Sequence, residues 1–308
     1  SRSAVMRLLI ISGPTGVGKS DLASRVAERL AGEIVCADSR QLYRGMPIGS
    51  AQPGLEERAR APHHLYETLE PGEACSAGRY RELALPVIRG IAARGRLPIL
   101  VGGTGLYVKA LTGSWELAPA ARPETVARLE SDAARRGTEE LWRELAGRDP
   151  AGSARLHPHD RYRIVRALAV LEDTGRPMSA WRHAATEVRA RDAGVRPVAL
   201  VRPRAELYAR IDRRAALMVA GGMLDEARRL AALGLDPARP PLNAIGFRRL
   251  FDVLTGRLGT AEATALMARD TRRYAKRQMT WLRGQHDVTW IEAGTVEAME
   301  KVAEMAAA

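Results

Sequence analysis

The chain has 308 residues, of which 46% are hydrophobic, a composition ordinary for a soluble protein with one large domain or a core plus an insert. Its two cysteines are too few for a disulfide framework or a cysteine-based zinc site, so we expect a reducing, cytoplasmic setting. Residues 1–7 lack the apolar stretch of a signal peptide, and no later segment approaches the ~20 apolar residues of a membrane span. The chain is therefore predicted to be soluble and intracellular.

Lys and Arg outnumber Asp and Glu by 48 to 36, which gives a net charge of +12 and an isoelectric point near 10.4. Such an excess is typical of proteins that bind polyanions, because cations on a phosphate-facing surface release counterions on binding. The same excess also fits a solvated, arginine-rich surface. The placement of the charges along the chain has to decide between the two.

The first third of the chain alternates between apolar runs typical of strands and amphipathic stretches typical of helices. The patterns predict, in chain order, a strand at 5–11, a helix at 18–30, a strand at 34–37, a helix at 76–94, a strand at 97–101 and a glycine-rich turn into a helix that ends near 109. This alternation favours a parallel sheet with helices on both faces. Ligands of such sheets bind at the carboxyl ends of the strands, where we expect Gly13, Asp38 and Thr104.

A purely helical stretch then interrupts the α/β pattern. Helices are predicted at 124–136, 138–148 and 160–173, before a strand at 196–202. Further helices are predicted from residue 205 to the end, with breaks at 221–222 and 235–241. We therefore expect an α/β core formed by residues 1–115 and 196–308, into which residues 116–195 are inserted as an all-helical domain.

The loop after the first strand has the form of a P-loop, the glycine-rich turn that binds phosphate groups. It comprises Gly13, Pro14, Thr15, Gly16, Val17, Gly18, Lys19 and Ser20. In this strand-loop-helix context the backbone N–H groups turn toward phosphate oxygens, Lys19 neutralises charge and Ser20 can bind Mg²⁺. The core is thus predicted to be a P-loop α/β fold. The motif does not say which bond breaks, since it suits a diphosphate leaving group as well as a triphosphate.

Asp38 follows the second predicted strand, and three interpretations of it remain open. It is a carboxylate associated with Mg²⁺, a general base that faces a nucleophile, or the cap of a turn. Gln41 carries a donor and an acceptor that suit the edge of a purine. Thr104, in Gly102-Gly-Thr-Gly105, either helps to bind an anion at a strand-to-helix junction or caps the helix.

The excess of cations becomes ordered in the last long helix. At about 100° per residue, one broad face collects six cations with no acidic residue among them, namely Arg269, Arg272, Arg273, Lys276, Arg277 and Arg283. Met267, Tyr274 and Trp281 recur at every seventh position on the opposite side. We predict that this side packs and that the cationic side contacts a phosphate backbone, with a solvated basic face as the alternative.

With these residues, the chain resembles the tRNA dimethylallyltransferase family, also called the tRNA isopentenyltransferases. The likeness is carried by GPTGVGKS, DSRQLYRGMPIGSAQP, VGGTGLYVKAL, LHPHDRYRIVRALAVLEDTG, the Ala244-Ile-Gly-Phe segment and DTRRYAKRQMTWLR, in family order from residue 13 to residue 283. The zinc finger of eukaryotic members has no counterpart here, so the resemblance is to the bacterial form.

The resemblance implies that a dimethylallyl group moves from its diphosphate to N6 of adenosine 37, next to the anticodon of a tRNA. It implies that Asp38 takes the proton of the adenine amine, a poor nucleophile, as the C–N bond forms. It further implies that the P-loop, its Mg²⁺ and Thr104 stabilise the departing diphosphate. Arg214 is similar to the family's diphosphate-binding arginine, although Arg210 and Arg213 lie beside it.

The resemblance also implies which residues contact the tRNA, whose target base has to leave its stack. In the family, the helical insert and the basic carboxyl-terminal helix hold the anticodon stem-loop. The matching positions here are Asp38, Ser39, Arg40, Gln41, Tyr162, Arg163, Ile164, Val165, Arg166, Arg272, Arg273, Lys276 and Arg277. We expect a monomer that needs no partner subunit.

The chain departs from the family pattern at three positions. Arg40 stands where the family usually has Met, and Ile245-Gly-Phe-Arg-Arg249 stands where the family has an Ile-Gly-Tyr-Lys-Glu-like run. The lost hydroxyl at Phe247 and the reversed charge at Arg249 are expected to affect contacts with the tRNA and not the reacting centre.

Three other functions fit parts of the pattern: a prenyl transferase for free adenine nucleotides, a nucleoside or nucleotide kinase, and a nucleic-acid-binding ATPase without transferase activity. The insert and the cationic helix speak against the first, because a small acceptor needs neither. In a kinase, Asp38 would serve the metal or the acceptor hydroxyl.

Overall fold

The computed structural model describes residues 7–112, 118–183, 194–237, 240–285 and 287–307. Their contacts form two compact units, one made of the described residues within 1–75, 82–108 and 190–308, the other of those within 76–81 and 109–189. The first is an α/β unit and the second is helical, so the predicted fold class is confirmed. None of the helices formed by the described residues is both long and apolar enough to span a bilayer.

A six-stranded parallel sheet forms the centre of the first unit, with the strand order β3-β2-β4-β1-β5-β6. Its strands are β1 (Leu8–Ser12), β2 (Gly32–Cys36), β3 (His63–His64), β4 (Leu97–Gly102), β5 (Val195–Val201) and β6 (Thr289–Glu292). β1, β2 and β4 consist almost entirely of buried residues, as expected for a parallel sheet covered on both faces. Ser12 pairs with Gly102 and Cys36 pairs with Val101, so these three strands end at the same edge.

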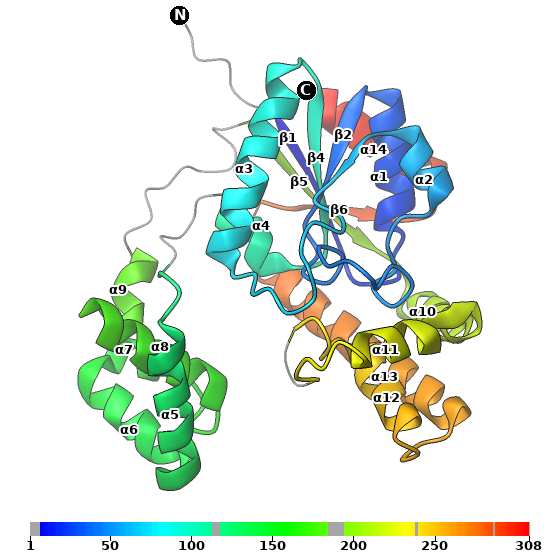
Figure 1. Cartoon of the computed structure of the whole chain (residues 1–308). Helices are drawn as coiled ribbons and strands as arrows, with labels where there is room; N and C mark the ends of the chain where they lie inside the picture. The colour runs from blue at the N-terminus through cyan, green and yellow to red at the C-terminus, as the bar shows by residue number, and fades with distance from the viewer. Residues whose placement is uncertain (1–6, 113–117, 184–193, 238–239, 286, 308) are drawn as a thin grey trace, which may run out of the picture. The chain divides into compact units, whose positions relative to one another are not determined.

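Helices surround this sheet and also gather at one end of it. The first group comprises α1 (Lys19–Arg29), α2 (Leu55–Arg60), α3 (Ala77–Ala93), α4 (Gly105–Leu111) and α14 (Val296–Ala307). Figure 1 shows α1, α2 and α14 on one side of the sheet and α3 on the other. The second group comprises α10 (Arg204–Met218), α11 (Leu224–Ala231), α12 (Ile245–Leu254) and α13 (Thr260–Arg283). Because α10 follows β5 directly, this group lies at the carboxyl ends of the strands (Figure 1).

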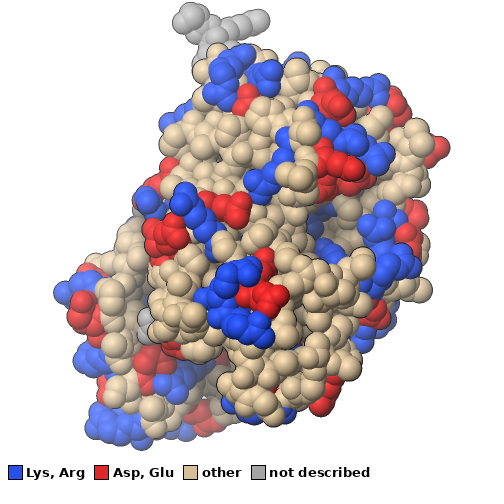
Figure 2. All heavy atoms as spheres, turned by 45° about the vertical axis from the view of Figure 1, so that its right-hand side comes forward, with Lys and Arg blue, Asp and Glu red and all other residues tan. Residues whose placement is uncertain are grey.

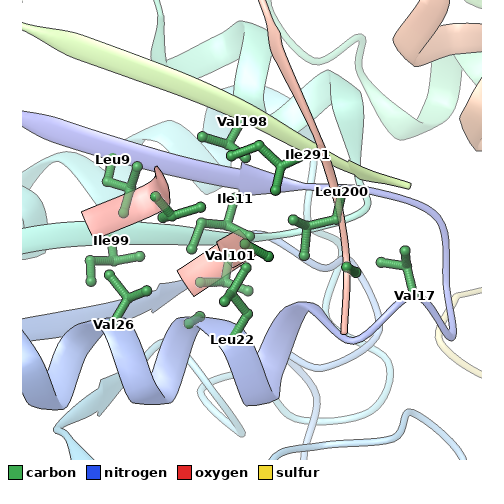
Figure 3. Packing of buried hydrophobic residues seen from close by; sticks show 14 of the residues in the cluster. Leu9, Ile11, Val17, Leu22, Val26, Ile99, Val101, Val198, Leu200 and Ile291 are labelled. Atoms are coloured by element: carbon green, nitrogen blue, oxygen red, sulfur yellow. The ribbon is translucent and has the colours of Figure 1, made fainter. Parts of the chain in front are cut away.

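Aliphatic side chains from the sheet and from α1 form the core of the first unit (Figure 3). Leu9 and Ile11 of β1, Ile99 of β4 and Val26 of α1 are all fully buried in this cluster. Burying one such side chain stabilises a fold by about 1.5–3 kcal/mol. This packing fixes α1 against the sheet, and with it the loop that joins β1 to α1.

The second unit is a bundle of α5 (Pro123–Arg136), α6 (Thr138–Arg148), α7 (Pro150–Ser153), α8 (Arg161–Thr174) and α9 (Met178–His183). Its core contains buried leucines such as Leu129, Leu141 and Leu168. Asp160 caps α8 by accepting a hydrogen bond from the backbone N–H of Arg163 at 3.2 Å. The three helices predicted in this stretch are confirmed to within about one residue at each end.

The carboxyl-terminal part both differs from and agrees with the prediction. Only helices are predicted after residue 205, but Thr289–Glu292 form β6. This edge strand is short, and Ile291 is its only buried residue, so the sequence pattern of these residues does not indicate a strand. Their extended conformation depends on pairing with β5. The predicted break at Gly221 and Gly222 is confirmed by a π-helical turn (Val219–Met223) in which Gly222 has a φ of +102°.

Candidate active site

The loop between β1 and α1 holds its lysine close to its own backbone. The Lys19 ammonium donates hydrogen bonds to the carbonyl oxygens of Gly13 and Pro14, each at 3.0 Å. The pKa of Lys19 is lowered to about 8, chiefly because the ammonium is buried. Asp38 opposes this shift and Arg214 adds to it. A buried cation with too little counter-charge favours the binding of an anion.

A cavity of about 400 Å³ opens beside this loop. The charged residues in its lining are Lys19, Arg210, Arg213, Arg214, Asp21, Asp38 and Glu57. Arg214 donates a hydrogen bond to the Thr15 hydroxyl, and Arg210 donates one to the carbonyl oxygen of Gly16 at 3.0 Å. Both arginines therefore bind the P-loop itself. We call this space the cationic cavity, and its charge suits a phosphate-bearing ligand.

Asp38 lies just beyond the end of β2, in a turn that two hydrogen bonds define. Its Oδ1 accepts a hydrogen bond from the backbone N–H of Arg40 at 2.9 Å. The Thr104 hydroxyl oxygen accepts one from the backbone N–H of Ser39, also at 2.9 Å. The Thr104 N–H in turn bonds to the carbonyl oxygen of Ala37 at 3.2 Å. The turn after β4 thus supports the turn after β2, and the structure brings Asp38 and Thr104 together.

A second cavity, of about 280 Å³, shares with the first the lining residues Thr15, Asp38, Ser50, Ala51 and Arg214. The rest of its lining mixes the apolar side chains of Met218, Met223 and Met267 with polar ones such as Arg40 and Arg277. Tyr274 also lies there, and burial is the main cause that raises its pKa to about 12. We call this space the methionine cavity. Asp38 therefore borders both the cationic cavity and the methionine cavity.

One wall of the methionine cavity is held by a buried carboxylate that the sequence patterns do not single out. Glu226 of α11 accepts hydrogen bonds from the backbone N–H groups of Ile48 at 2.7 Å and Gly49 at 2.8 Å. Its complete burial raises its pKa in spite of these two bonds. The signal available in the sequence is a glutamate on the apolar face of its helix, at helical spacing from Met223 and Leu230.

The side-chain amide of Gln41 forms its hydrogen bonds within its own loop. Its Nε2 donates hydrogen bonds to the carbonyl oxygens of Ser50 at 3.0 Å and Ala51 at 2.7 Å. Both N–H groups are thus used within the protein, although the side chain still borders the cationic cavity. In this structure the Gln41 Nε2 group is therefore not available to donate to the edge of a purine, as the sequence-based interpretation requires.

The glycines around Thr104 are explained by the close approach of α13. The Gln278 Nε2 donates a hydrogen bond to the carbonyl oxygen of Gly103 at 3.1 Å. A Cβ atom at Gly103 would lie 2.2 Å from that nitrogen, and one at Gly105 would lie 2.4 Å from the Trp281 ring. Both positions therefore require a residue without a side chain. Packing against α13 is sufficient to account for these two glycines.

The cationic face predicted on α13 carries less free charge than its sequence indicates. Asp270, at the edge of this face, accepts hydrogen bonds from Arg249 of α12 at 2.9 Å and from Arg269 at 3.0 Å. Arg272 forms an ion pair with Asp212 of α10. The helical pattern of α13 alone does not reveal these pairs, because two of the partners come from other helices.

Three of the predicted RNA-contacting residues of α13 are exposed: Arg273, Lys276 and Arg277. Arg277 lines the methionine cavity, where its guanidinium carbon lies 5.7 Å from the centre of the Tyr274 ring. Figure 2 shows Lys and Arg interspersed with Asp and Glu on the face in view. On that face the net positive charge lies in mixed patches and not in one continuous band.

The predicted contact residues of the second unit lie on different sides of α8. Tyr162 is 73% exposed, Arg163 is also exposed, and Arg166 is half-buried. Ile164 and Val165 are 0% and 2% exposed, within the core of this unit. The structure does not support tRNA contacts by the side chains of Ile164 and Val165, because the helix turns them inward.

The three departures from the family pattern have identifiable surroundings. Phe247 is fully buried, and a Cβ atom at Gly49 would lie 2.3 Å from its ring. Arg249 is bound to Asp270, and Arg40 lines the methionine cavity. Phe247 and Arg249 therefore stabilise the packing of α12 in this chain.

The fold and its two adjoining cavities define an α/β protein with a P-loop motif and an inserted helical unit. A family model described as IPP transferase matches residues 41–285, well over half of the chain. The chain belongs to the IPP transferase family.

Relatives and solved structures agree with this assignment. The tRNA dimethylallyltransferase of Anaeromyxobacter dehalogenans (strain 2CP-C) is 49% identical over 289 residues, which cover 93% of this chain and 95% of the relative. The tRNA isopentenylpyrophosphate transferase of Bacillus halodurans has a TM-score of 0.70 at 36% identity, covering 98% of this chain and 95% of that one. A eukaryotic dimethylallyltransferase acting on tRNA has a TM-score of 0.77 at 26% identity, covering 98% of this chain and 77% of that one.

Proposed function

We propose that this chain transfers a dimethylallyl group from dimethylallyl diphosphate to N6 of adenosine 37 in tRNA, giving N6-isopentenyladenosine and diphosphate. The observation that carries the proposal is that Asp38 borders both the cationic and the methionine cavity. A base is needed where a donor held on one side meets an acceptor held on the other. The names of the relatives support tRNA as the acceptor.

In this proposal the cationic cavity receives the diphosphate end of the donor. As the bond between the donor carbon and the diphosphate oxygen breaks, negative charge develops on the leaving group. Lys19, Arg214 and the P-loop N–H groups stabilise that charge. The Lys19 ammonium, which bonds to backbone carbonyl oxygens in the free protein, exchanges them for phosphate oxygens. Contact of Thr104 with the departing oxygen stays a prediction, and the Ser39 hydrogen bond supports a role in holding the Asp38 turn.

The methionine cavity receives the adenine. A base has to leave its stack to reach an enclosed site, and thioether side chains adapt well to a flat aromatic ring. As the new bond forms between N6 and the donor carbon, Asp38 takes the proton that N6 loses. The neutral, alkylated amine and the diphosphate are then the products.

The residues of the cationic cavity fit a Mg²⁺ ion that binds together with the diphosphate. Ser20, Asp21 and Asp38 line this cavity, and Mg²⁺ commonly takes one or two carboxylates plus substrate phosphate oxygens. Among the described residues, no group of three or more His, Cys, Asp or Glu side chains could hold the ion by itself. Ser20 would bind the ion, and the ion would neutralise charge on the leaving diphosphate.

The proposed tRNA contacts fall on both units. On the α/β unit they are Ser39 and Arg40 at the methionine cavity and Arg273, Lys276 and Arg277 on α13. On the helical unit, the exposure of Tyr162 and Arg163 supports them as contacts. We further propose that the protein acts as a cytoplasmic monomer.

One assay separates this function from its alternatives. The protein is incubated with Mg²⁺, labelled dimethylallyl diphosphate and unmodified tRNA, and in parallel with free adenine nucleotides or with ATP. Label on the tRNA is the expected result. Label on a free nucleotide would indicate the small-acceptor transferase, a phosphorylated acceptor would indicate a kinase, and ATP hydrolysis alone would indicate an ATPase.

A further inference from the structure

A third cavity, of about 200 Å³, lies between α10 and α13. Its apolar lining comprises Pro14, Leu207, Tyr208, Ala275 and Met279, and its cations are Arg202, Arg204, Lys276 and Arg283. None of the described residues in its lining carries a carboxylate, whereas the cationic cavity contains three. A rim of four cations, of which Arg202 is paired with Glu206, around an apolar floor suits a ligand with a flat apolar part and a negative charge.

The aromatic ring and one of the cations of this cavity are held in place. The guanidinium carbons of Arg204 and Arg272 lie 5.1 Å and 6.0 Å from the centre of the Tyr208 ring, so a base that stacks on this ring takes the place of one of them. Arg202 donates a hydrogen bond from Nε to the carbonyl oxygen of Val17 at 2.8 Å and forms an ion pair with Glu206. Arg204 and Lys276 are exposed and can reach a bound anion.

We propose that this cavity binds one nucleotide of the tRNA strand close to the target adenosine, with its base against Tyr208 and Met279 and its phosphate beside Arg204 and Lys276. The proposal rests on the proposed function and adds a second point of RNA contact. An aromatic platform accepts any base because every base has a π face. Lysine and arginine bind the phosphodiester without regard to sequence.

The place of the cavity in the fold favours an RNA strand over a free nucleotide. Lys276 lines this cavity, and the next residue, Arg277, lines the methionine cavity. Pro14 lines this cavity, and the next residue, Thr15, lines the methionine cavity. Successive side chains of a helix point about 100° apart, so the two cavities lie on different sides of α13. A strand that delivers its adenine to the methionine cavity can pass around α13 and place a neighbouring nucleotide against Tyr208.

The test measures the binding of unmodified tRNA to the full chain over a range of salt concentrations. Tyr208→Ala should weaken this binding about tenfold through the loss of one stacked base. Arg204→Ala should lower the slope of log affinity against log salt by about one. Tyr208→Phe keeps the ring and should bind like the wild type. Arg228→Ala is the matched control, because Arg228 is an exposed arginine of α11 that pairs with Asp225.

Tyr208 also packs against the core, so the melting temperature of each variant is recorded. Arg204 is exposed, and its replacement should leave the core intact.

Each outcome of the binding experiment decides a different point. If the wild type binds no tRNA, the proposed function itself fails. If it binds tRNA and both alanine variants keep its affinity and salt slope, only the nucleotide subsite is overturned. If adenosine monophosphate binds to the wild type, and Tyr208→Ala abolishes this binding but leaves tRNA binding unchanged, the cavity binds a free nucleotide and the assignment to RNA is overturned.

Discussion

The side-chain oxygen of Gln278 accepts a hydrogen bond from the backbone N–H of Thr15 at 2.8 Å, although 263 positions separate the two residues. The same amide group donates to Gly103, and it is only 7% exposed. One side chain of α13 therefore holds the P-loop and the turn before Thr104 together. Because α13 also carries Lys276 and Arg277, the helix that faces the proposed RNA also shapes the donor site.

Replacing Gln278 by Met, which has a similar length but cannot form either bond, should loosen this connection. Each buried backbone group left without a partner costs about 1–3 kcal/mol, so we expect a lower melting temperature and a KM for dimethylallyl diphosphate raised roughly tenfold. Gln285→Met is the matched control, because Gln285 bonds to the carbonyl oxygen of Trp281 and not to the P-loop.

A second variant separates positioning from general destabilisation. In Gln278→Glu, a protonated carboxyl group can accept from Thr15 and donate to Gly103, whereas the carboxylate can only accept. The activity of this variant relative to the wild type should therefore rise as the pH falls. A ratio independent of pH would count against the positioning role.

Replacing Asp38 by Ala should remove the proposed base. We expect turnover to fall by roughly 10²–10⁴-fold, the usual contribution of general base catalysis, while tRNA affinity changes little. Asp38→Asn is the closer comparison, because its side-chain oxygen can still accept the hydrogen bond of the Arg40 N–H. Single-turnover rates with saturating tRNA measure the effect, and unaltered turnover in both variants would exclude Asp38 as the base.

Replacing Thr104 by Ala should slow the reaction while the fold stays intact. The variant leaves the N–H of Ser39 without its acceptor, one residue from Asp38. Thr104→Ser retains the hydroxyl and should recover most of the rate. Circular dichroism checks the fold, and equal rates for Ala and Ser would mean that the hydroxyl has no part in the reaction.

The lowered pKa of Lys19 predicts that diphosphate binding depends on pH. In the free protein Lys19 loses its proton near pH 8, and a bound phosphate, which favours the ammonium, raises that pKa again. Binding should therefore take up protons above about pH 8, and affinity should fall as the pH rises further. Calorimetry in buffers of different ionisation enthalpy measures the uptake, and Lys19→Met should abolish it.

Replacing Arg273 and Lys276 together by Ala should flatten the salt dependence of tRNA binding. Each lost phosphate contact lowers the slope by about one. Both side chains are exposed, so the melting temperature should hardly change. An unchanged slope would assign the cations of α13 to a solvated surface.

Much of the α/β unit could be predicted because its signals are local. Apolar runs such as Leu8–Ser12 and Leu97–Gly102 are buried on both faces, and the P-loop motif marks the turn between a strand and a helix. The meeting of Asp38 and Thr104 follows from the rule that parallel strands end at one edge. β6 could not be predicted, because its conformation depends on pairing with β5.

The parts of the site that sequence patterns missed depend on contacts between distant segments. Gln278 reaches the P-loop, and Glu226 reaches a loop 178 residues earlier in the chain. The unpaired positive charge of α13 was overestimated for the same reason, since Asp212, which pairs with Arg272, lies on another helix. Ile164 and Val165 entered the predicted RNA surface through a motif, and only the packing of the helical unit revealed their burial.

The carboxylate of Glu226 has a consequence for the evolution of donor and acceptor selectivity. It holds the loop at Ile48 and Gly49 from α11, whose described residues line neither the cationic nor the methionine cavity. Shortening this side chain by one methylene would draw the loop toward α11 and enlarge the space next to Asp38. The width of the methionine cavity could thus be changed through a helix that lines neither cavity, while Asp38 itself stays unchanged.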